Sequence, residues 1–529
     1  MNISKFIREI PEEERTPLVI QLLEIIQFQT EQIQQLKDEI ARLKGQKPKP
    51  DIKPSRLEKP RKKGSASDSK KSGKRPGSDK RSKTKSLEIN DDKVVQPDFI
   101  PEGSRFKGYQ DYVVQDLLFQ PHNIRFRLAC WEGPDRSRYV GKVPEEFRGK
   151  HFGPHLISFI LFQHYHAMTT QPLILEQLLE IGIDISAGQI NRILIENKDE
   201  FHQEKEEILK VGLEVSRYIN VDDTGARHDG KNGYCTHIGN EHFAYFESSE
   251  SKNRINFLRA LQADRRNYVI NTDAVGYLVS GKLPAKELRE LCKLMGSSFG
   301  NDQAWQAALD IAGITSPRHV QIATEGALVG GLMENGFNPK LVIISDDAGQ
   351  FNVFLHGLCW IHAERTISRM SGFNEAQRKA LEDKRGQIWD YYNDLKKYKI
   401  NPTVDEKNRL KDLFDVIFKG DTAFATLNMA LKRLHANKEE LLLVLERPEI
   451  PLHNNLSEND IREYVKKRKI SGSTRSSPGR RCRDTFASLK KTCRKLGISF
   501  WDFLKDRSAG TCDAIPYLPD VIRNRACES

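Results

Sequence analysis

The sequence predicts a mixed α/β protein, and three observations support this prediction. Residues 218–221 (Tyr-Ile-Asn-Val) combine β-branched and aromatic residues, which suit a buried strand. Residues 341–344 form a continuous apolar run, which is typical of a strand buried on both faces. From 218 to 275 the pattern predicts three strands, a helix over 254–262 and a fourth strand over 268–275. Strands and helices in this order favour the α/β class.

The basic character of the chain is concentrated in one segment. The whole chain has a net charge of +11, and residues 47–85 hold 16 Lys or Arg and 4 Asp or Glu. The local net charge of +12 leaves the rest of the chain near −1. Residues 46–92 are also rich in Pro, Ser and Gly and poor in apolar residues, which predicts a disordered basic linker. Such a segment suits nucleic acid, or less often anionic lipid, and it can also be a plain solvated tether.

The cysteine pattern predicts reduced thiols. The chain has eight cysteines at scattered positions, and no apolar run approaches the length of a membrane span. No signal peptide precedes them, so we expect a cytoplasmic protein.

The N-terminal segment, residues 1–45, contains a heptad pattern that predicts a coiled coil. Ile and Val occupy the a positions and Leu most of the d positions, which favours a parallel two-stranded coiled coil and a homodimer or higher oligomer. The alternative is a single amphipathic helix that packs on its own protein. The a positions are Val19, Ile26, Ile33 and Ile40, and the d positions are Leu22, Gln29, Leu36 and Leu43.

Two small regions follow the linker. Residues 93–150 show period-2 alternation and turn residues, which predict a small β-rich module of three short strands over 109–119, 124–133 and 135–144. Residues 151–212 predict helices, with Ser186 as the N-cap of the third. The helix, glycine turn, helix order suits a helix-turn-helix that binds DNA, although ordinary helical hairpins share it. Its candidate DNA contacts are Gln189, Asn191 and Arg192.

Two pairs of acidic residues follow the predicted buried strands. Asp222 and Asp223 come directly after residues 218–221, and Asp346 and Asp347 follow 341–344 and Ser345. Asp273 similarly ends the predicted fourth strand. Carboxylates held rigidly at strand ends are suited to a hard cation such as Mg²⁺. An Asp pair before Thr-Gly can also simply form a turn.

Two later stretches carry further polar residues. Cys359 and His362 have a Cys-x-x-His spacing, which alone is a weak zinc pattern, and the Cys359 and Trp360 side chains suit a core. After a charged helical stretch over 372–447, Glu458 stands three residues beyond Asn455 and four before Arg462. Glu458 is therefore a candidate capping-box residue with an ion pair, or an acid beside a polyanion site. The surrounding cations are Lys466, Lys467, Arg468, Lys469, Arg475, Arg480, Arg481 and Arg483.

These stretches together resemble transposases of the insertion sequence 66 family. The motifs are V-D-D-T-G, S-D-D-A-G-Q-F with C-W-I-H-A-E-R, and N-N-x-S-E-N-D-I-R with R-K-I-S-G-S-T-R. The resemblance implies a ribonuclease H-like catalytic core with a metal triad of Asp222, Asp346 and Glu458. That core would comprise residues 213–371 and 448–505, with 372–447 as a helical insertion and 506–529 as a C-terminal tail of plain surface. Many relatives resemble a zinc finger after the linker, whereas residues 93–150 hold only Cys130, so we expect no metal there.

The resemblance implies a DNA transposase that cuts and joins the ends of its own element. The triad would hold two Mg²⁺ ions, with Mn²⁺ as a substitute, and the partners would be terminal inverted repeats, target DNA and, where the element encodes them, accessory proteins. The cations Lys466, Lys467, Arg468, Lys469 and Arg475 would contact DNA. Two alternatives stay open: a non-catalytic dimeric DNA-binding regulator, and a ribonuclease H-like nuclease or resolvase that does not transpose.

Overall fold

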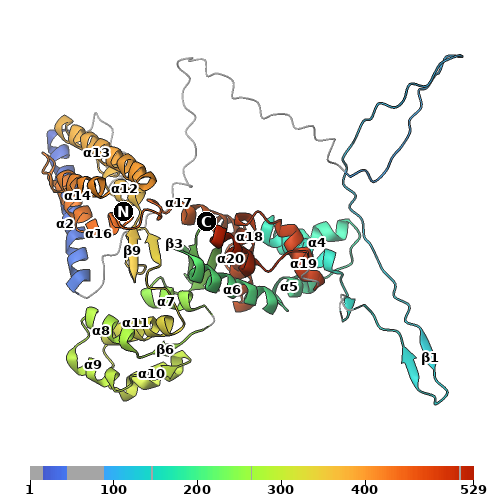
Figure 1. The fold of residues 1–529 in the computed structure, drawn as a ribbon, viewed down its shortest axis with the longest axis horizontal. Coiled ribbons are helices and arrows are strands. Elements are labelled where there is room, and N and C mark those ends of the chain that lie inside the picture. The colour runs from blue at the N-terminus through green and yellow to red at the C-terminus, as the bar shows by residue number, and fades with distance from the viewer. Residues whose placement is uncertain are drawn as a thin grey trace. The chain divides into compact units, whose positions relative to one another are not determined.

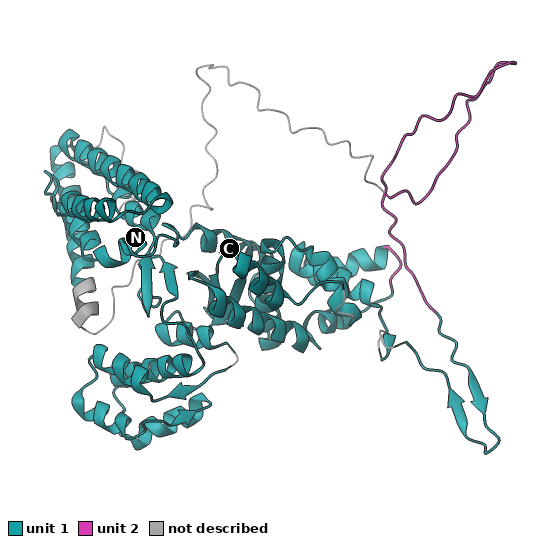
Figure 2. Ribbon diagram, viewed as in Figure 1, with its two compact units in different colours: residues 1–51, 125–180, 184–529 teal, residues 52–124, 181–183 magenta. Residues whose placement is uncertain are grey.

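The computed structural model describes residues 16–43, 88–144, 147–149, 151–263, 265–510 and 514–528. It divides into two units (Figure 2): residues 52–124 with 181–183, and the remainder of the chain. In the first of these, the described residues 88–124 form no helix or strand. All elements below belong to the second unit. No helix among the described residues is long and apolar enough to cross a membrane.

A mixed five-stranded sheet forms the centre of the fold and confirms the predicted α/β class. Its order is β5-β4-β3-β8-β9. Strands β3, β4 and β5 form an antiparallel meander, while β8 and β9 continue the sheet parallel to β3. The strands span Tyr218–Gly225 (β3), Tyr234–Gly239 (β4), Ala244–Ser249 (β5), Val342–Ser345 (β8) and Leu355–Leu358 (β9).

Strand β3 is longer than the sequence predicts. It continues through Asp222 and Asp223, which pair with His237 and Thr236 of β4. The prediction that these acids follow the end of the strand is therefore wrong, because the long hairpin with β4 keeps the chain extended. The parallel pairing of β3 with β8 nevertheless stops at Asn220. Asp222 thus lies just beyond the parallel part of the sheet, on the side where β8 ends.

A helical segment connects β5 to β8. The predicted helix over 254–262 is confirmed as α7. The predicted fourth strand is wrong: only Tyr268–Val269 (β6) is extended, it pairs with Ser298–Phe299 (β7) outside the main sheet, and Asn271 caps a helix directly afterwards. Asp273 lies in the first turn of that helix and not at a strand end. The helices are Arg254–Gln262 (α7), Thr272–Ser280 (α8), Ala285–Cys292 (α9), Asp302–Ile311 (α10) and Pro317–Glu334 (α11).

The stretch predicted to be helical over 372–447 does consist of helices (Figure 1). They share a core with β8, β9 and the helix α12, around the buried Trp360, whose indole Nε1 donates to the carbonyl of Leu441 at 2.9 Å. The elements are Trp360–Ser368 (α12), Glu375–Ile400 (α13), Val404–Lys419 (α14), Ala425–His435 (α15), Lys438–Leu441 (α16) and the 3-10 turn Leu443–Leu445.

The N-terminal heptads lie in one helix, α2 (Pro17–Leu43), which packs on this helical insertion. Leu23 is buried against Phe373, and Glu31 pairs with Arg433 at 2.5 Å. The seam side chains Leu22, Ile26, Ile33 and Leu36 lie on another face and stay 39–58% exposed. Ile40 and Leu43 belong to the end of the helix whose side chains the structure does not describe. The helix therefore packs on its own chain with one face, and coiled-coil pairing through the other stays a prediction.

The predicted helices before the sheet are present, and Ser186 is the N-cap of α5 as expected. The structure adds a capping box in which Gln189 takes part. Residues 109–119, in contrast, form no strand, which corrects the predicted three-stranded module. Only a short hairpin remains of it, Cys130–Glu132 (β1) with Arg138–Val140 (β2). The helices are Pro154–Leu161 (α3), which continues as a π-helix over Phe162–His166, Gln171–Glu180 (α4), Ala187–Ile195 (α5) and Asp199–Val215 (α6).

The C-terminal part is helical and well packed. The expectation of a plain surface tail is wrong, because Arg507 forms a buried pair with Glu204 at 3.0 Å, and Leu518 and Ile522 are fully buried. This packing attaches the end of the described chain to α6. The helices are Asn455–Ser471 (α17), Ser477–Lys495 (α18), Phe500–Ala509 (α19) and Leu518–Glu528 (α20).

Candidate active site

Three elements bring the predicted acids together at one edge of the sheet. Asp222 lies in β3, Asp346 follows the last residue of β8, and Glu458 lies in the first turn of α17. Burial raises the pKa of Asp222 well above its usual range, and the charges of Asp346, Asp223 and Glu458 raise it further. Burial, followed by the charges of Asp223 and Glu458, raises the pKa of Asp346 to about 6. The four carboxylates are thus close enough to repel one another.

Asp223 has a different environment from its neighbour. Its two oxygens accept hydrogen bonds from Thr236 Oγ1 at 2.6 Å and from Gln350 Nε2 at 2.7 Å. Gln350 belongs to the loop after Asp346, whose Gly349 carbonyl accepts from the half-buried Arg254 at 2.7 Å. Asp223 therefore fixes the loop that carries Asp346, which suits a structural role better than a ligand role.

Glu458 is not a capping residue. Helix α17 begins at Asn455, one residue earlier than a cap at Asn455 would require, and its N-terminus has no side-chain capping bond. Arg462 donates to Asn459 and not to Glu458. Glu458 instead accepts from Arg365 at 3.0 Å and lies 3.4 Å from His362 Nε2. The alternative in which Glu458 forms a capping box with Asn455 and an ion pair with Arg462 is therefore wrong.

The site contains a buried oxygen with no partner. Asp346 Oδ1 is shielded from solvent and makes no hydrogen bond, and such a group is costly unless something binds it. Crowded carboxylate oxygens are the donors that hard cations prefer. Asp222 and Asp346 fit such a cation, while Glu458 is engaged by Arg365 and His362. Within the described residues, no group of three or more His, Cys, Asp or Glu side chains is arranged to hold a metal ion.

His362 and Cys359 do not act as a pair. Cys359 is buried at the start of α12, and its sulfur accepts from the backbone N–H of Asn454 at 3.2 Å. Burial raises the pKa of this thiol to about 11, so it stays protonated. Burial and the neighbouring Arg365 lower the pKa of His362 to about 4, so its ring is neutral at neutral pH. Cys359 and Trp360 pack in the core, as the sequence indicates.

The structure separates the candidate DNA contacts into two groups. Lys467 is buried, donates to the His164 carbonyl at 2.7 Å, and has its pKa lowered to about 7 by burial and by nearby cations. Arg468 donates to the Gly225 carbonyl and so ties α17 to the end of β3. Gln189 and Asn191 are only partly exposed, and both are engaged within the helical region, Gln189 by its capping box and Asn191 by Gln171. The side chains that remain exposed are Arg192, Lys466, Lys469 and Arg475.

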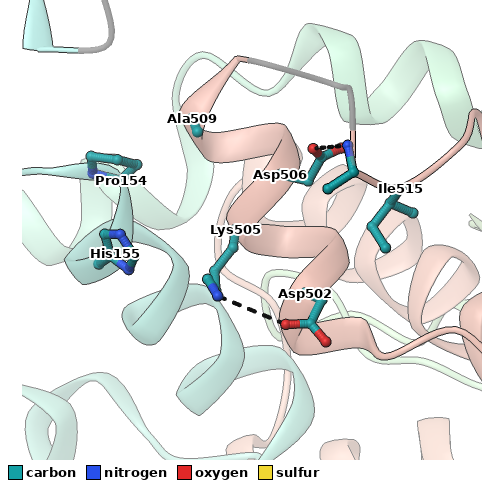
Figure 3. A pocket seen from close by; sticks show the side chains of 8 residues that line it. Pro154, His155, Asp502, Lys505, Asp506, Ala509 and Ile515 are labelled. Carbon is teal, nitrogen blue, oxygen red and sulfur yellow. Dashed lines mark hydrogen bonds and ion pairs between the residues drawn. The ribbon is translucent and has the colours of Figure 1, made fainter.

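A separate pocket of about 410 Å³ contains none of these acids. It is lined by α3 and α19 and the segment after α19 (Figure 3). Its charged groups already have partners, because Lys505 lies 3.8 Å from Asp502 and Asp506 accepts from the Ala514 N–H at 3.0 Å. These pairings leave the pocket without a converging set of free polar groups.

The sequence does not single out several residues that shape the site. Four residues support the acids through hydrogen bonds, and all of them lie within or next to the sequence motifs that contain the acids. They are Asn220, Asn454, Gln350 and Arg365. The sequence does not indicate a role for Asn454, directly before α17, because it suggests the neighbouring Asn455 as the helix cap. Only the tertiary contacts reveal its partners.

The site is an acidic cluster at one end of a mixed sheet, with a helical insertion before its last acid. Residues 335–481 match the family described as "Transposase IS66 family", and this range holds Asp346 and Glu458. The chain is also 39% identical over 321 residues to "Uncharacterized protein y4jO" of Sinorhizobium fredii (strain NBRC 101917 / NGR234), covering 60% of this chain and 100% of that protein. The chain belongs to the IS66 family of transposases, and its role is that of a transposase.

Proposed function

We propose that the protein cleaves the ends of its own insertion sequence and joins them to target DNA at a site formed by Asp222, Asp346 and Glu458. The observation that carries the proposal is the convergence of these carboxylates from β3, β8 and α17, with the buried Asp346 Oδ1 left without a partner. The strand order of the sheet supports a ribonuclease H-like core. An enzyme with this substrate works at the nucleoid of the bacterial cytoplasm.

The acids would act by holding divalent cations against the scissile phosphate. Two Mg²⁺ ions, when bound, supply the activation of the attacking oxygen and the stabilisation of the leaving oxygen. Asp222 and Asp346 would hold them from the sheet edge, because both side chains are fixed by buried strands. Glu458 would join them by exchanging its contact with Arg365. The released guanidinium can then donate to a phosphate oxygen, for which its planar fork is suited.

The DNA would lie along exposed cations of α17, of the turn after it and of α5. Lys466, Lys469 and Arg475 come from α17 and the turn after it, and Arg192 comes from α5 of the helical region. Exposed lysines and arginines bind the phosphate backbone and position it without reading sequence. We propose that α4 and α5 contribute to binding the terminal repeats as a helix-turn-helix, with Arg192 in contact with DNA.

The full chain with labelled duplexes that carry the terminal inverted repeats of its element tests the proposal. We expect Mg²⁺-dependent nicking at the repeat end, followed by joining of the 3′ end to a target plasmid. Cleavage without joining would indicate a nuclease or resolvase. Tight binding of the repeats without cleavage would indicate a DNA-binding regulator.

Residues 47–85, which lie outside the described residues, are expected to supply non-specific affinity for DNA. Their local net charge of +12 should release counterions when the segment meets a duplex. Replacing the Lys and Arg of this segment by Gln should therefore flatten the salt dependence of binding to random-sequence duplex. The measurement is the slope of log Kd against log salt concentration, and an unchanged slope would assign the affinity to the folded region.

A further inference from the structure

Asn454 lies directly before α17 and is fully buried, with 1% of its surface exposed. Asparagine at this position usually caps the helix by accepting a backbone hydrogen bond with its side chain. The Asn454 side chain makes no such bond. Its amide is directed to another element, so the helix forgoes the stabilisation that a cap would give.

The amide group of Asn454 is bonded to strand β3 at both ends. Its Nδ2 donates to the carbonyl of Val221 at 2.7 Å, and its Oδ1 accepts from Asn220 Nδ2 at 2.9 Å. Asn220 is itself 1% exposed. The Val221 carbonyl needs a donor, which fixes the orientation of the Asn454 amide. Two short bonds in a dry environment hold α17 in one position against β3.

The backbone of Asn454 reaches the other two acid-bearing segments. Its N–H donates to Cys359 Sγ at 3.2 Å, and the Cys359 N–H donates to the carbonyl of Ser345 at 3.0 Å. Its carbonyl accepts from the N–H of Glu458 at 3.3 Å. Asn454 is thus hydrogen-bonded to Val221, which precedes Asp222, and to the backbone of Glu458. Through Cys359 it is also connected to Ser345, which precedes Asp346.

We propose that Asn454 is a positioning residue that sets the mutual spacing of Asp222, Asp346 and Glu458, an inference that rests on the proposed function. Residues that orient metal ligands through hydrogen bonds affect metal binding nearly as strongly as the ligands themselves. A carboxylate that shifts by about an ångström no longer matches the coordination geometry of Mg²⁺, which is strict. Because the buried Asn454 amide is bonded to Val221 and Asn220, its effect on the cation would pass through the acids.

Asn454→Ala and Asn220→Ala test the inference in the full chain. Asn454→Ala removes both side-chain bonds, whereas Asn220→Ala removes only the bond between the two amides and is the milder change for folding. Asn459→Ala is the matched control, because Asn459 lies on the exposed face of the same helix and accepts from Arg462. Mn²⁺ affinity is measured by electron paramagnetic resonance without DNA, beside melting temperature, affinity for end DNA and the Mg²⁺ concentration that half-saturates cleavage.

We expect Asn454→Ala to weaken Mn²⁺ binding and to raise the half-saturating Mg²⁺ concentration by about 10- to 100-fold. Asn220→Ala should have a smaller effect in the same direction, and Asn459→Ala none, while all three variants keep the DNA affinity of the wild type. A lower melting temperature with unchanged metal affinity in both Asn454→Ala and Asn220→Ala would overturn the inference and leave Asn454 a packing residue. If Asn454→Ala does not fold, unchanged metal affinity in Asn220→Ala alone overturns it. A wild-type protein that neither binds Mn²⁺ nor cleaves would overturn the proposed function itself.

Discussion

Glu458→Gln is expected to lower Mg²⁺-dependent nicking at the element end by roughly 100-fold or more, since a ligand should matter at least as much as the residues that orient it. The neutral amide removes a full charge from a divalent-ion site and is a poorer ligand for a hard cation. The fold should survive, because Glu458 caps nothing and a Gln amide oxygen can still accept from Arg365. The assay is nicking of a labelled end substrate, with melting temperature and DNA affinity measured in parallel.

Glu463→Gln is the matched control for this variant. It is the same substitution on the same helix, but Glu463 pairs with Lys491 and Arg494 on α18 and not with the acid cluster. It should cleave at a nearly normal rate. If Glu458→Gln cleaves as well as Glu463→Gln does, Glu458 is not the third acid. Asp460 would be a poor replacement for it, because it is buried in a pair with His237 and Lys495.

Asp222→Asn and Asp346→Asn are expected to abolish cleavage in the same way, and the losses should not add in a double variant, because the acids act as one unit. Asp223→Asn should be milder for cleavage and should cost stability, since an amide cannot accept from both Thr236 and Gln350. Asp347→Asn should also be milder. Cleavage rates and melting temperatures, measured on each variant, distinguish acids that bind the cation from acids that support the fold.

The metal-free protein should lose stability as the pH rises through the acid range. The pKa of Asp346 is raised to about 6 in the folded chain, against about 4 for an unfolded aspartate. A raised pKa contributes stability below the unfolded value, and this contribution is lost as the pH passes the folded value. Melting temperature in EDTA should therefore fall between pH 4 and about 7 more steeply for the wild type than for Asp346→Asn, and Mg²⁺ should restore it. Equal slopes would show that burial and the neighbouring carboxylates do not raise the pKa of Asp346.

Disruption of the exposed seam of α2 is expected to convert the oligomer to a monomer. Ile26 and Ile33 are 39% and 52% exposed in the single chain and occupy a positions of the heptad pattern. Replacing both with Asp puts charges into the core of a two-stranded coiled coil, which should prevent pairing. Because these side chains contact solvent in the single chain, its melting temperature should change little. Light scattering measures the mass of the variant.

The Leu23→Ala variant distinguishes pairing between two α2 helices from packing of α2 on its own chain. Leu23 is 4% exposed and packs against Phe373 of the same chain, so its truncation should loosen α2 from the helical insertion but leave the seam intact. We therefore expect Leu23→Ala to keep the oligomer. An unchanged mass for the double Asp variant would mean that another surface makes the main contact.

The fold could be predicted where local pattern and tertiary packing agree. The apolar run before Asp346 is a buried strand, the helix over 254–262 has the predicted bounds, and Ser186 caps its helix as expected. The strand predicted over residues 109–119 does not form. Alternation of apolar and polar residues gives a strand only if another strand pairs with it, and here Leu117 and Val114 stay 79% and 72% exposed. The α/β class can thus be predicted from the sequence. The length of β3 cannot, because it depends on the long hairpin with β4.

The candidate site was only partly predictable, for a related reason. Asp222 and Asp346 could be proposed from the strands that carry them. Glu458 has a sequence context that suits a cap equally well, and only its contacts with Arg365 and His362 decide between the two. The role of Asn454 depends on a bond to Asn220, 234 residues away, and no local pattern encodes such a contact.

The wide separation of the three acids along the chain has a consequence for synthesis. Ribosomes produce β3 and β8 well before α17, and domains fold from the N-terminal side during translation. If the basic segment binds DNA as proposed, it would do so while the third carboxylate is still untranslated. Asn454 and Glu458 emerge together, so the spacing of the acids is completed in one late step. On the proposed function, a prematurely terminated chain that lacks α17 would then bind DNA without cutting it.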